Sequence, residues 1–248
     1  MNTTATLEQL HELKLSGMSR SYQAVLQMPL NKHPEAHALI AQLVQAEKQN
    51  RVHYKTQIYL KLSKLRYAAS LEEITCGTER NLSKEQLLQL ADCSYLDRAE
   101  NILISGATGS GKSFMACALG HQACAMGYKS LYLNLNRFME KIMMAKLDGS
   151  FVKLLNQLER VSLLILDDFG LAPMDQNTRL ALLQILEDRY AKKSVIIASQ
   201  LPIAKWHQYI DEPTLADAIM DRLLTNANRF ELKGESLRKK STGNTTKN

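Results

Sequence analysis

Residues 101–114 read Asn-Ile-Leu-Ile-Ser-Gly-Ala-Thr-Gly-Ser-Gly-Lys-Ser-Phe: an apolar run, a glycine-rich turn and the start of an apolar helix. A GxxxxGK[ST] motif in that context predicts a phosphate-binding loop, or P-loop. Glycine adopts backbone angles that side chains forbid, so successive N–H groups can point at phosphate oxygens. The predicted phosphate-binding residues are Gly106, Ala107, Thr108, Gly109, Ser110, Gly111, Lys112 and Ser113.

The last two residues of this loop have separate expected roles. Lys112 is expected to reach the β- and γ-phosphates of a nucleoside triphosphate, and the Ser113 hydroxyl to bind Mg²⁺. The helix that begins here would also present the positive end of its dipole to the phosphates. The alternative is a glycine-rich turn that fits the motif without binding a ligand.

A second motif, at residues 163–168, is an apolar segment that ends in two aspartates. Carboxylates at the end of a buried strand suit a metal-bound phosphate, so Asp167 is expected to hold Mg²⁺ through water. Asp168 is expected to polarise the attacking water, because successive side chains of a strand point to opposite faces. Alone, paired acids after a strand often only begin a turn, but together with the P-loop they predict a hydrolytic site.

Two later positions are further candidates for catalysis. The predicted strand at residues 194–199 ends in Ser199 and is followed by Gln200, and a polar side chain there can sit between the γ-phosphate and water. We favour Gln200, with Ser199 as the alternative. Arg222 is either half of a surface ion pair with Asp221 or an arginine finger that reaches the γ-phosphate of a neighbouring subunit.

The pattern of apolar residues predicts alternating strands and helices from about residue 100 onward, which is typical of a parallel sheet flanked by helices. Strands are expected at 102–105, 130–133, 161–167, 194–199 and 229–232, and helices at 112–126, 136–147, 151–159, 176–191 and 214–227. Because composition changes near residues 94–100, we expect a helical N-terminal domain over 1–95, an ATPase domain over 96–240 and a disordered basic tail over 241–248.

The N-terminal region has the 3.6-residue period of helices. Two short helices are expected between residues 6 and 27, a long one from residue 35, and another beginning at Ser83 with a capping box to Gln86. The long helix is basic, with aromatic residues interleaved, which suits a DNA backbone; the alternative is a solvated helix face. The predicted DNA-binding residues are Arg51, Lys55, Lys61, Lys64 and Arg66.

Composition sets broad limits on the kind of protein. The net charge of +6 and pI near 9.1 are compatible with a polyanionic partner but do not require one. The four cysteines lack the spacing of a zinc site, and neither a secretion signal nor a membrane-spanning run is evident. We therefore expect a cytoplasmic protein with no membrane partner.

Several stretches resemble IstB-type ATPases, which assist insertion-sequence transposition and are similar to DnaC-type helicase loaders within the AAA+ class. They are residues 103–113, 164–171, 199–202 with Trp206 and His207, 216–223, and 232–239. The resemblance covers nearly the whole chain. It implies an AAA+ core that uses ATP and Mg²⁺, forms an ATP-bridged ring or spiral of identical subunits, bends double-stranded DNA, and recruits and stimulates a partner transposase.

The chain departs from general AAA+ proteins at two points. About sixteen residues follow the last predicted strand, too few for a helical lid domain and its arginine. Asp168 stands where glutamate is commoner, which predicts slow hydrolysis. A helicase loader is the main alternative function, because it would use the same ATPase core with another partner. A small-molecule P-loop kinase is a third, disfavoured by the paired aspartates and Arg222.

Overall fold

The computed structural model describes residues 3–237 of the chain, and these fall into two compact units divided between Ile58 and Tyr59. The sequence placed the division at 95/96. The structure differs because residues that follow Tyr59 contribute to the core of the second unit. These are Ala69, Leu82, Leu87, Leu90 and Tyr95, all buried with the first strand of the sheet. The expected tail at 241–248 lies outside the described residues.

The first unit is helical, as expected. It contains α1 (Thr3–Glu12), α2 (Ser16–Leu26), the short 3₁₀ turn η1 (Leu30–Lys32) and most of α3 (Ala36–Ser63). Gly17 allows α2 to approach α3 closely, since a Cβ there would lie 2.5 Å from the Ala46 carbonyl oxygen. The buried Glu47 carboxylate accepts a hydrogen bond of 2.8 Å from the Gly17 N–H. These contacts fix one helix against the other.

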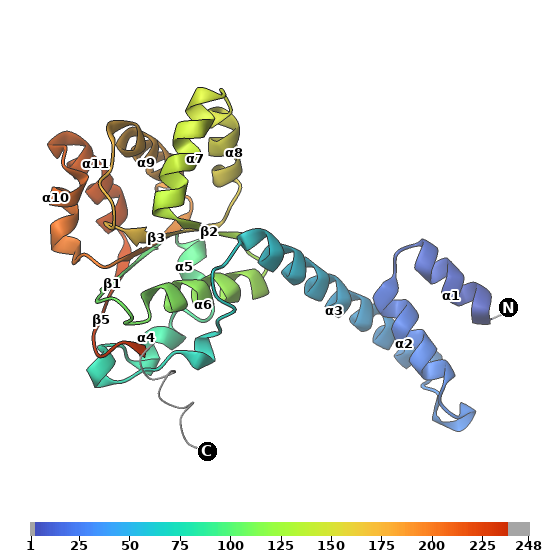
Figure 1. The fold of residues 1–248 in the computed structure, drawn as a ribbon. Coiled ribbons are helices and arrows are strands. Elements are labelled where there is room, and N and C mark those ends of the chain that lie inside the picture. Colours follow the sequence, from blue (N-terminus) through green and yellow to red (C-terminus); the bar gives the residue numbers. More distant parts are fainter. Residues whose placement is uncertain (1–2, 238–248) are drawn as a thin grey trace, which may run out of the picture. The chain divides into compact units, whose positions relative to one another are not determined.

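The second unit is built on a sheet of five parallel strands (Figure 1). The strands are β1 (Asn101–Gly106), β2 (Ser130–Asn134), β3 (Leu163–Phe169), β4 (Ser194–Ser199) and β5 (Ala227–Leu232). Their spatial order is β2-β3-β4-β1-β5. The strand that precedes the P-loop therefore lies inside the sheet, between β4 and β5, and its carboxyl end lies beside theirs.

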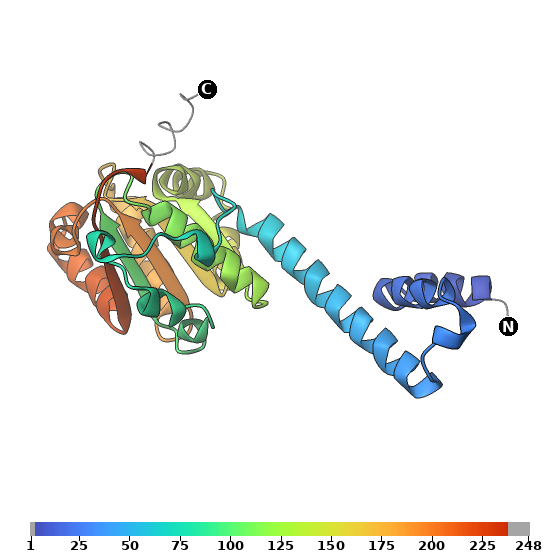
Figure 2. The ribbon, with the colours of Figure 1, turned by 90° about the horizontal axis from the view of Figure 1, so that it is seen from below.

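Helices cover both faces of this sheet, and alternate strand residues pack against each layer (Figures 1 and 2). One layer contains α6 (Lys112–Ala125), α4 (Lys84–Leu88) and α5 (Ser94–Asp97), together with the 3₁₀ turns η2 (Leu71–Glu73) and η3 (Thr78–Arg80). The other layer contains α7 (Leu135–Leu147), α8 (Phe151–Glu159), α9 (Gln176–Arg189), the turn η4 (Ile203–Lys205), α10 (Trp206–Ile210) and α11 (Pro213–Leu224).

Most elements follow the sequence-based expectation, with shifts at their ends. The capping box of Ser83 and Gln86 is confirmed, and Asp175 caps α9. The helix expected at 136–147 begins one residue earlier and is capped by Asn134, because β2 runs directly into that helix. The helices α5 and α10 were not expected; each has no more than five residues, too short for a periodic pattern. Within residues 3–237, no helix is both long and apolar enough to cross a membrane.

Candidate nucleotide site

The P-loop joins β1 to α6 at the carboxyl edge of the sheet. Gly109 and Gly111 have φ angles of 81° and 95°, in the left-handed region that favours glycine. Gly106 is needed for space, since a Cβ would lie 2.3 Å from the Leu232 carbonyl oxygen on β5. The Lys112 ammonium donates a hydrogen bond of 2.8 Å to the Ala107 carbonyl oxygen and so folds over the loop.

A cavity of about 520 Å³ opens over this loop. Its lining includes residues of the P-loop together with Arg66, Asp168 and Gln200. The segment that follows α3 also contributes, both with charged groups, Glu73 and Arg80, and with apolar or aromatic ones, among them Tyr67, Ile74 and Leu82. The cavity thus combines charged groups suited to phosphates with apolar groups suited to a base.

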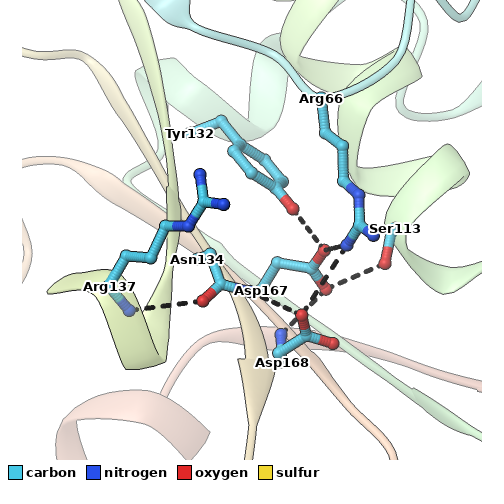
Figure 3. Close-up of polar contacts among 7 residues, drawn as sticks. All are labelled: Arg66, Ser113, Tyr132, Asn134, Arg137, Asp167 and Asp168. Carbon is cyan, nitrogen blue, oxygen red and sulfur yellow. Dashed lines mark hydrogen bonds and ion pairs between the residues drawn. The ribbon is translucent and has the colours of Figure 1, made fainter. Parts of the chain in front are cut away.

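The paired aspartates lie at an irregularity of the sheet. Pairing of β3 with β4 shifts register between Leu166 and Phe169, and Asp168 has a φ of 61°. A bulge of this kind redirects side chains next to it. The two carboxylates therefore lie near one another and near the P-loop (Figure 3). This placement results from the bulge and differs from the opposite orientations that we expected from strand alternation.

Asp167 is buried and held from two sides. Its Oδ1 accepts a hydrogen bond of 3.0 Å from the Ser113 hydroxyl, and its Oδ2 accepts one of 2.5 Å from the Tyr132 hydroxyl (Figure 3). Burial, and then the hydrogen bond to Asp167, raise the pKa of Tyr132, which keeps that hydroxyl protonated as a donor. Asp167 and Ser113 are thus brought together as predicted from the sequence.

These two groups fit a magnesium ion that arrives with a nucleotide. A carboxylate and a hydroxyl are hard oxygen ligands, and Mg²⁺ in nucleotide sites is held by one or two protein oxygens together with phosphates and water. Among the described residues, no cluster of three or more His, Cys, Asp or Glu side chains offers a metal site that needs no nucleotide.

Asp168 is engaged by another partner. Its Oδ2 accepts a hydrogen bond of 2.6 Å from the Asn134 side-chain amide, at the carboxyl end of β2 (Figure 3). Burial, followed by the charge of Asp167, raises the pKa of Asp168. One carboxylate oxygen of Asp168 is therefore occupied by Asn134, and this hydrogen bond fixes the orientation of the group.

The structure separates the two candidates after β4. The Gln200 side chain is exposed in the cavity, and its Oε1 accepts a hydrogen bond of 2.8 Å from the Thr108 hydroxyl of the P-loop. Ser199 is fully buried; its hydroxyl donates to the Phe169 carbonyl oxygen at 2.6 Å and accepts from the Leu201 N–H at 3.0 Å. Gln200 is placed to meet a ligand, whereas Ser199 holds β3 and β4 together.

Arg222 lies far from the nucleotide cavity of its own chain. The Asn101 side-chain amide, at the start of β1, donates a hydrogen bond of 2.9 Å to the Arg222 carbonyl oxygen. The P-loop follows the other end of β1, which is roughly 17 Å away for a strand of this length. The Arg222 guanidinium pairs with Glu187 at 2.5 Å and Asp221 at 3.3 Å, and its Nε, buried, has no partner among the described residues.

The five predicted DNA-binding residues do not form one group. Arg51, in the first unit, is exposed and pairs with Glu47 at 2.8 Å, and Lys55 is also exposed. In the second unit, Lys61 and Lys64 are exposed at the end of α3. Arg66 is separate, because its guanidinium lies in the nucleotide cavity beside the paired aspartates (Figure 3).

Sequence reasoning missed several residues of the site. Tyr132 and Asn134 occupy the carboxyl end of β2, next to β3 in the sheet, and the polar Asn134 after an apolar strand was an available signal. Arg80 gave no signal. It is buried, lines the same cavity, and donates to the Ser110 carbonyl oxygen at 2.6 Å and to the Glu235 carbonyl oxygen at 3.0 Å, so it holds the P-loop in place.

Comparisons with known proteins agree with this geometry. A family model described as IstB-like ATP binding protein matches residues 8–245. The Sinorhizobium fredii protein y4pL, whose name gives it as a candidate insertion sequence ATP-binding protein, is 39% identical over 234 residues, which are 94% of this chain and 96% of that protein.

Two solved structures are similar in fold. AMPPCP-bound DnaA from Aquifex aeolicus gives a TM-score of 0.59 at 20% identity, over 75% of this chain and 57% of that one. A DnaC helicase loader gives 0.53 at 17% identity, over 68% of this chain and 99% of that one. With the observed sheet, they confirm the expected α/β fold with a P-loop AAA+ core preceded by helices.

Proposed function

Since the chain belongs to the family of IstB-like ATP binding proteins and is an AAA+ ATPase of the insertion-sequence type, we propose that it assembles on double-stranded DNA with ATP, bends that DNA, and recruits and stimulates a partner transposase. The observation that carries this proposal is the division of the catalytic residues. P-loop residues, Asp168 and Gln200 line one cavity, and Asp167 is hydrogen-bonded to Ser113 of that loop, while Arg222 lies on another part of the same unit.

Within the cavity, each residue has a distinct task. Backbone N–H groups of the P-loop and the Lys112 ammonium bind the phosphates of ATP. Ser113 and Asp167 hold Mg²⁺, which when bound neutralises charge on the β- and γ-phosphates. Asp168, held by Asn134 through one carboxylate oxygen, takes a proton from the attacking water, and Gln200 orients that water.

Arg222 completes the site of a neighbouring copy in this proposal. Roughly the length of β1 separates it from its own P-loop, so it can serve only another subunit as an arginine finger. A contact of this kind joins two different surfaces of the same protein, and its repetition produces a ring or a spiral. ATP held between subunits then makes assembly depend on nucleotide.

DNA binding in this proposal relies on exposed cations of α3. Arg51, Lys55, Lys61 and Lys64 can each meet a phosphate of the DNA backbone, and such contacts release counterions. Binding through phosphates alone does not read sequence, so an assembly of many copies can grip and deform DNA of varied sequence.

The helicase loader remains the alternative function, since the fold is similar to that of a DnaC helicase loader. Both functions use the same ATPase core, so the partner distinguishes them. Tagged protein with ATP and DNA should retain a transposase from cell extract. Recovery of a replicative helicase in its place would favour the loader.

The proposal is tested by the anisotropy of a labelled DNA duplex. We expect binding to require ATP and Mg²⁺ and to weaken steeply between about 50 and 200 mM salt. Lys112→Ala should lose ATP-dependent binding, whereas Asp168→Asn should bind ATP, stop hydrolysing it and remain on DNA. Weak binding that is independent of ATP would contradict the proposal.

Matched lysine variants test the DNA surface. Lys61→Gln and Lys64→Gln should each lower the slope of log affinity against log salt by about one. Lys192→Gln is the control, because Lys192 is an exposed lysine on the loop after α9 and has no proposed contact with DNA. Equal slopes in all three variants would show that the lysines at the end of α3 do not contact DNA.

A further inference from the structure

Arg66 is the residue whose place departs most from its sequence-based prediction. Three residues beyond the end of α3, it lines the nucleotide cavity together with Lys112, Asp168 and Gln200. Its NH1 atom lies 3.7 Å from Asp168 Oδ2 and 4.0 Å from Asp167 Oδ2 (Figure 3). A cation in this position faces the place where a metal-bound phosphate would lie.

The guanidinium lies close to the two carboxylates but beyond hydrogen-bond distance of either. Both distances exceed the 2.7–2.9 Å that is typical of a hydrogen bond between charged groups. The side chain keeps 44% of its surface exposed, although it lies among residues of the cavity. A guanidinium carries five N–H donors in a planar fork that matches phosphate oxygens, so it retains capacity for a ligand.

The backbone around Arg66 is fixed against the P-loop helix. Leu65 packs on Gly120 of α6 so closely that a Cβ on Gly120 would lie 2.7 Å from Leu65 Cδ2. On the other side, the Tyr67 ring lies 6.3 Å from the Phe114 ring, and the Arg66 guanidinium lies 5.4 Å above the Tyr67 ring. Arg66 is therefore held in register with the loop that binds the phosphates.

The position of the terminal phosphate follows from the other residues of the site. A phosphate bound to a metal on Ser113 and Asp167, and also reached by Lys112, must lie beside the two aspartates. Arg66 lies within 4.0 Å of both aspartates. The β-phosphate is held by the loop itself, so the terminal phosphate is the group of the nucleotide that Arg66 meets.

We propose that Arg66 binds the terminal phosphate of a nucleoside triphosphate in its own subunit and thereby makes the site prefer the triphosphate to the diphosphate. This inference rests on the proposed function, in which ATP occupies this cavity.

The test compares affinities for AMPPCP, which is not hydrolysed, and ADP, by titration calorimetry with Mg²⁺ on the full chain. Arg66→Gln should weaken AMPPCP binding by about tenfold to a hundredfold, because a hydrogen bond between charged groups is lost. ADP affinity should stay within about twofold, because the lost partner is the phosphate that ADP lacks. Lys192→Gln is the control, since it removes an exposed cation of the same unit that lies outside the cavity, and it should leave both affinities unchanged.

Arg66→Lys separates a direct contact from a general effect of charge. Lysine keeps the charge but loses the planar fork, so a direct contact predicts only partial recovery of AMPPCP affinity. Full recovery by lysine, equal losses for both nucleotides, unchanged affinities, or tighter AMPPCP binding by Arg66→Gln would each overturn the proposal. Failure of the unaltered protein to bind either nucleotide would instead refute the proposed function itself.

Discussion

At the scale of single residues, the site depends on which polar groups are already occupied. Asp167 has both carboxylate oxygens engaged by hydroxyls, so its position is fixed before a ligand arrives. Asp168 is tied to Asn134, and the left-handed backbone at Asp168 comes with strain that a regular strand lacks. The residue proposed to hold the metal is thus preorganised, and the residue proposed to activate water is held by Asn134 through one carboxylate oxygen.

Gln200 and Ser199 give a sharp prediction, because they are adjacent and differently placed. Gln200→Ala should slow ATP hydrolysis at least about tenfold, since water loses the group that orients it, and leave thermal stability unchanged. Ser199→Ala should destabilise the fold by about 1–3 kcal/mol, since the Phe169 carbonyl and the Leu201 N–H both lose a buried partner. Phosphate release and thermal unfolding measure the two effects.

The reverse pattern would exchange the roles of these residues. If Ser199→Ala lost hydrolysis at an unchanged melting temperature while Gln200→Ala hydrolysed ATP normally, Ser199 would be the group that faces the ligand. ATP affinity serves as the control for both variants and should stay within about twofold, because neither side chain is proposed to bind the nucleotide in its ground state.

At the scale of elements, local patterns predicted the sheet well and the segment between the units poorly. The P-loop and the strand at 163–169 have signals that lie within a few residues, so their types and order followed from sequence. The stretch 64–82 has no periodic pattern, and only its contacts with α6 and the P-loop reveal that it lines the cavity. Arg66 was therefore grouped with the cations of α3.

The bulge at the paired aspartates had no sequence signal either. Strand alternation alone predicts opposite faces for Asp167 and Asp168, and the break in pairing between β3 and β4 overrides it. The sequence favoured the glutamine after β4 and left Ser199 as the alternative, and only the structure supplies a physical basis for choosing between them. That basis is their contacts: the Gln200 amide oxygen accepts a hydrogen bond from Thr108, whereas the Ser199 hydroxyl donates to the Phe169 carbonyl oxygen.

The close approach of α2 and α3 in the first unit makes a testable element-level prediction. Gly17→Val should break that contact, because the new Cβ would meet the Ala46 carbonyl oxygen at 2.5 Å and the Glu47 Cα at 2.6 Å. Overpacking of this kind costs about 1–3 kcal/mol or more. We expect rapid proteolysis within residues 3–58 and unchanged ATP affinity, measured by mass spectrometry of fragments and by nucleotide titration.

Ala24→Val is the matched control for this variant. Ala24 is an exposed residue of the same helix α2, so the same side chain is introduced without a clash. Its proteolysis should equal that of the unaltered protein. If Gly17→Val were equally resistant, the two helices would not pack at Gly17 in solution.

At the scale of the whole molecule, the position of Arg222 decides whether catalysis belongs to one chain or to an assembly. Its carbonyl is bound at the start of β1, and the P-loop lies beyond the end of that strand. Its side chain is 28% exposed and its guanidinium pairs with Glu187 and Asp221, so exchange of these partners for a phosphate on another copy is possible without unfolding α11. The family match and the remote arginine together favour shared sites.

Mixing two inactive variants tests this sharing. Arg222→Ala should bind ATP but lose about 10³-fold or more of its hydrolysis, whereas Lys112→Ala should fail to bind ATP while keeping its arginine. In an equal mixture, about one interface in four joins an intact P-loop to an intact arginine on the neighbour, so hydrolysis should recover to about a quarter of the normal rate. Phosphate release in the presence of DNA measures the recovery, and the double variant Lys112→Ala with Arg222→Ala, mixed with either single variant, should give none. Absence of recovery, with both variants folded by circular dichroism, would show that Arg222 does not act on a neighbouring site.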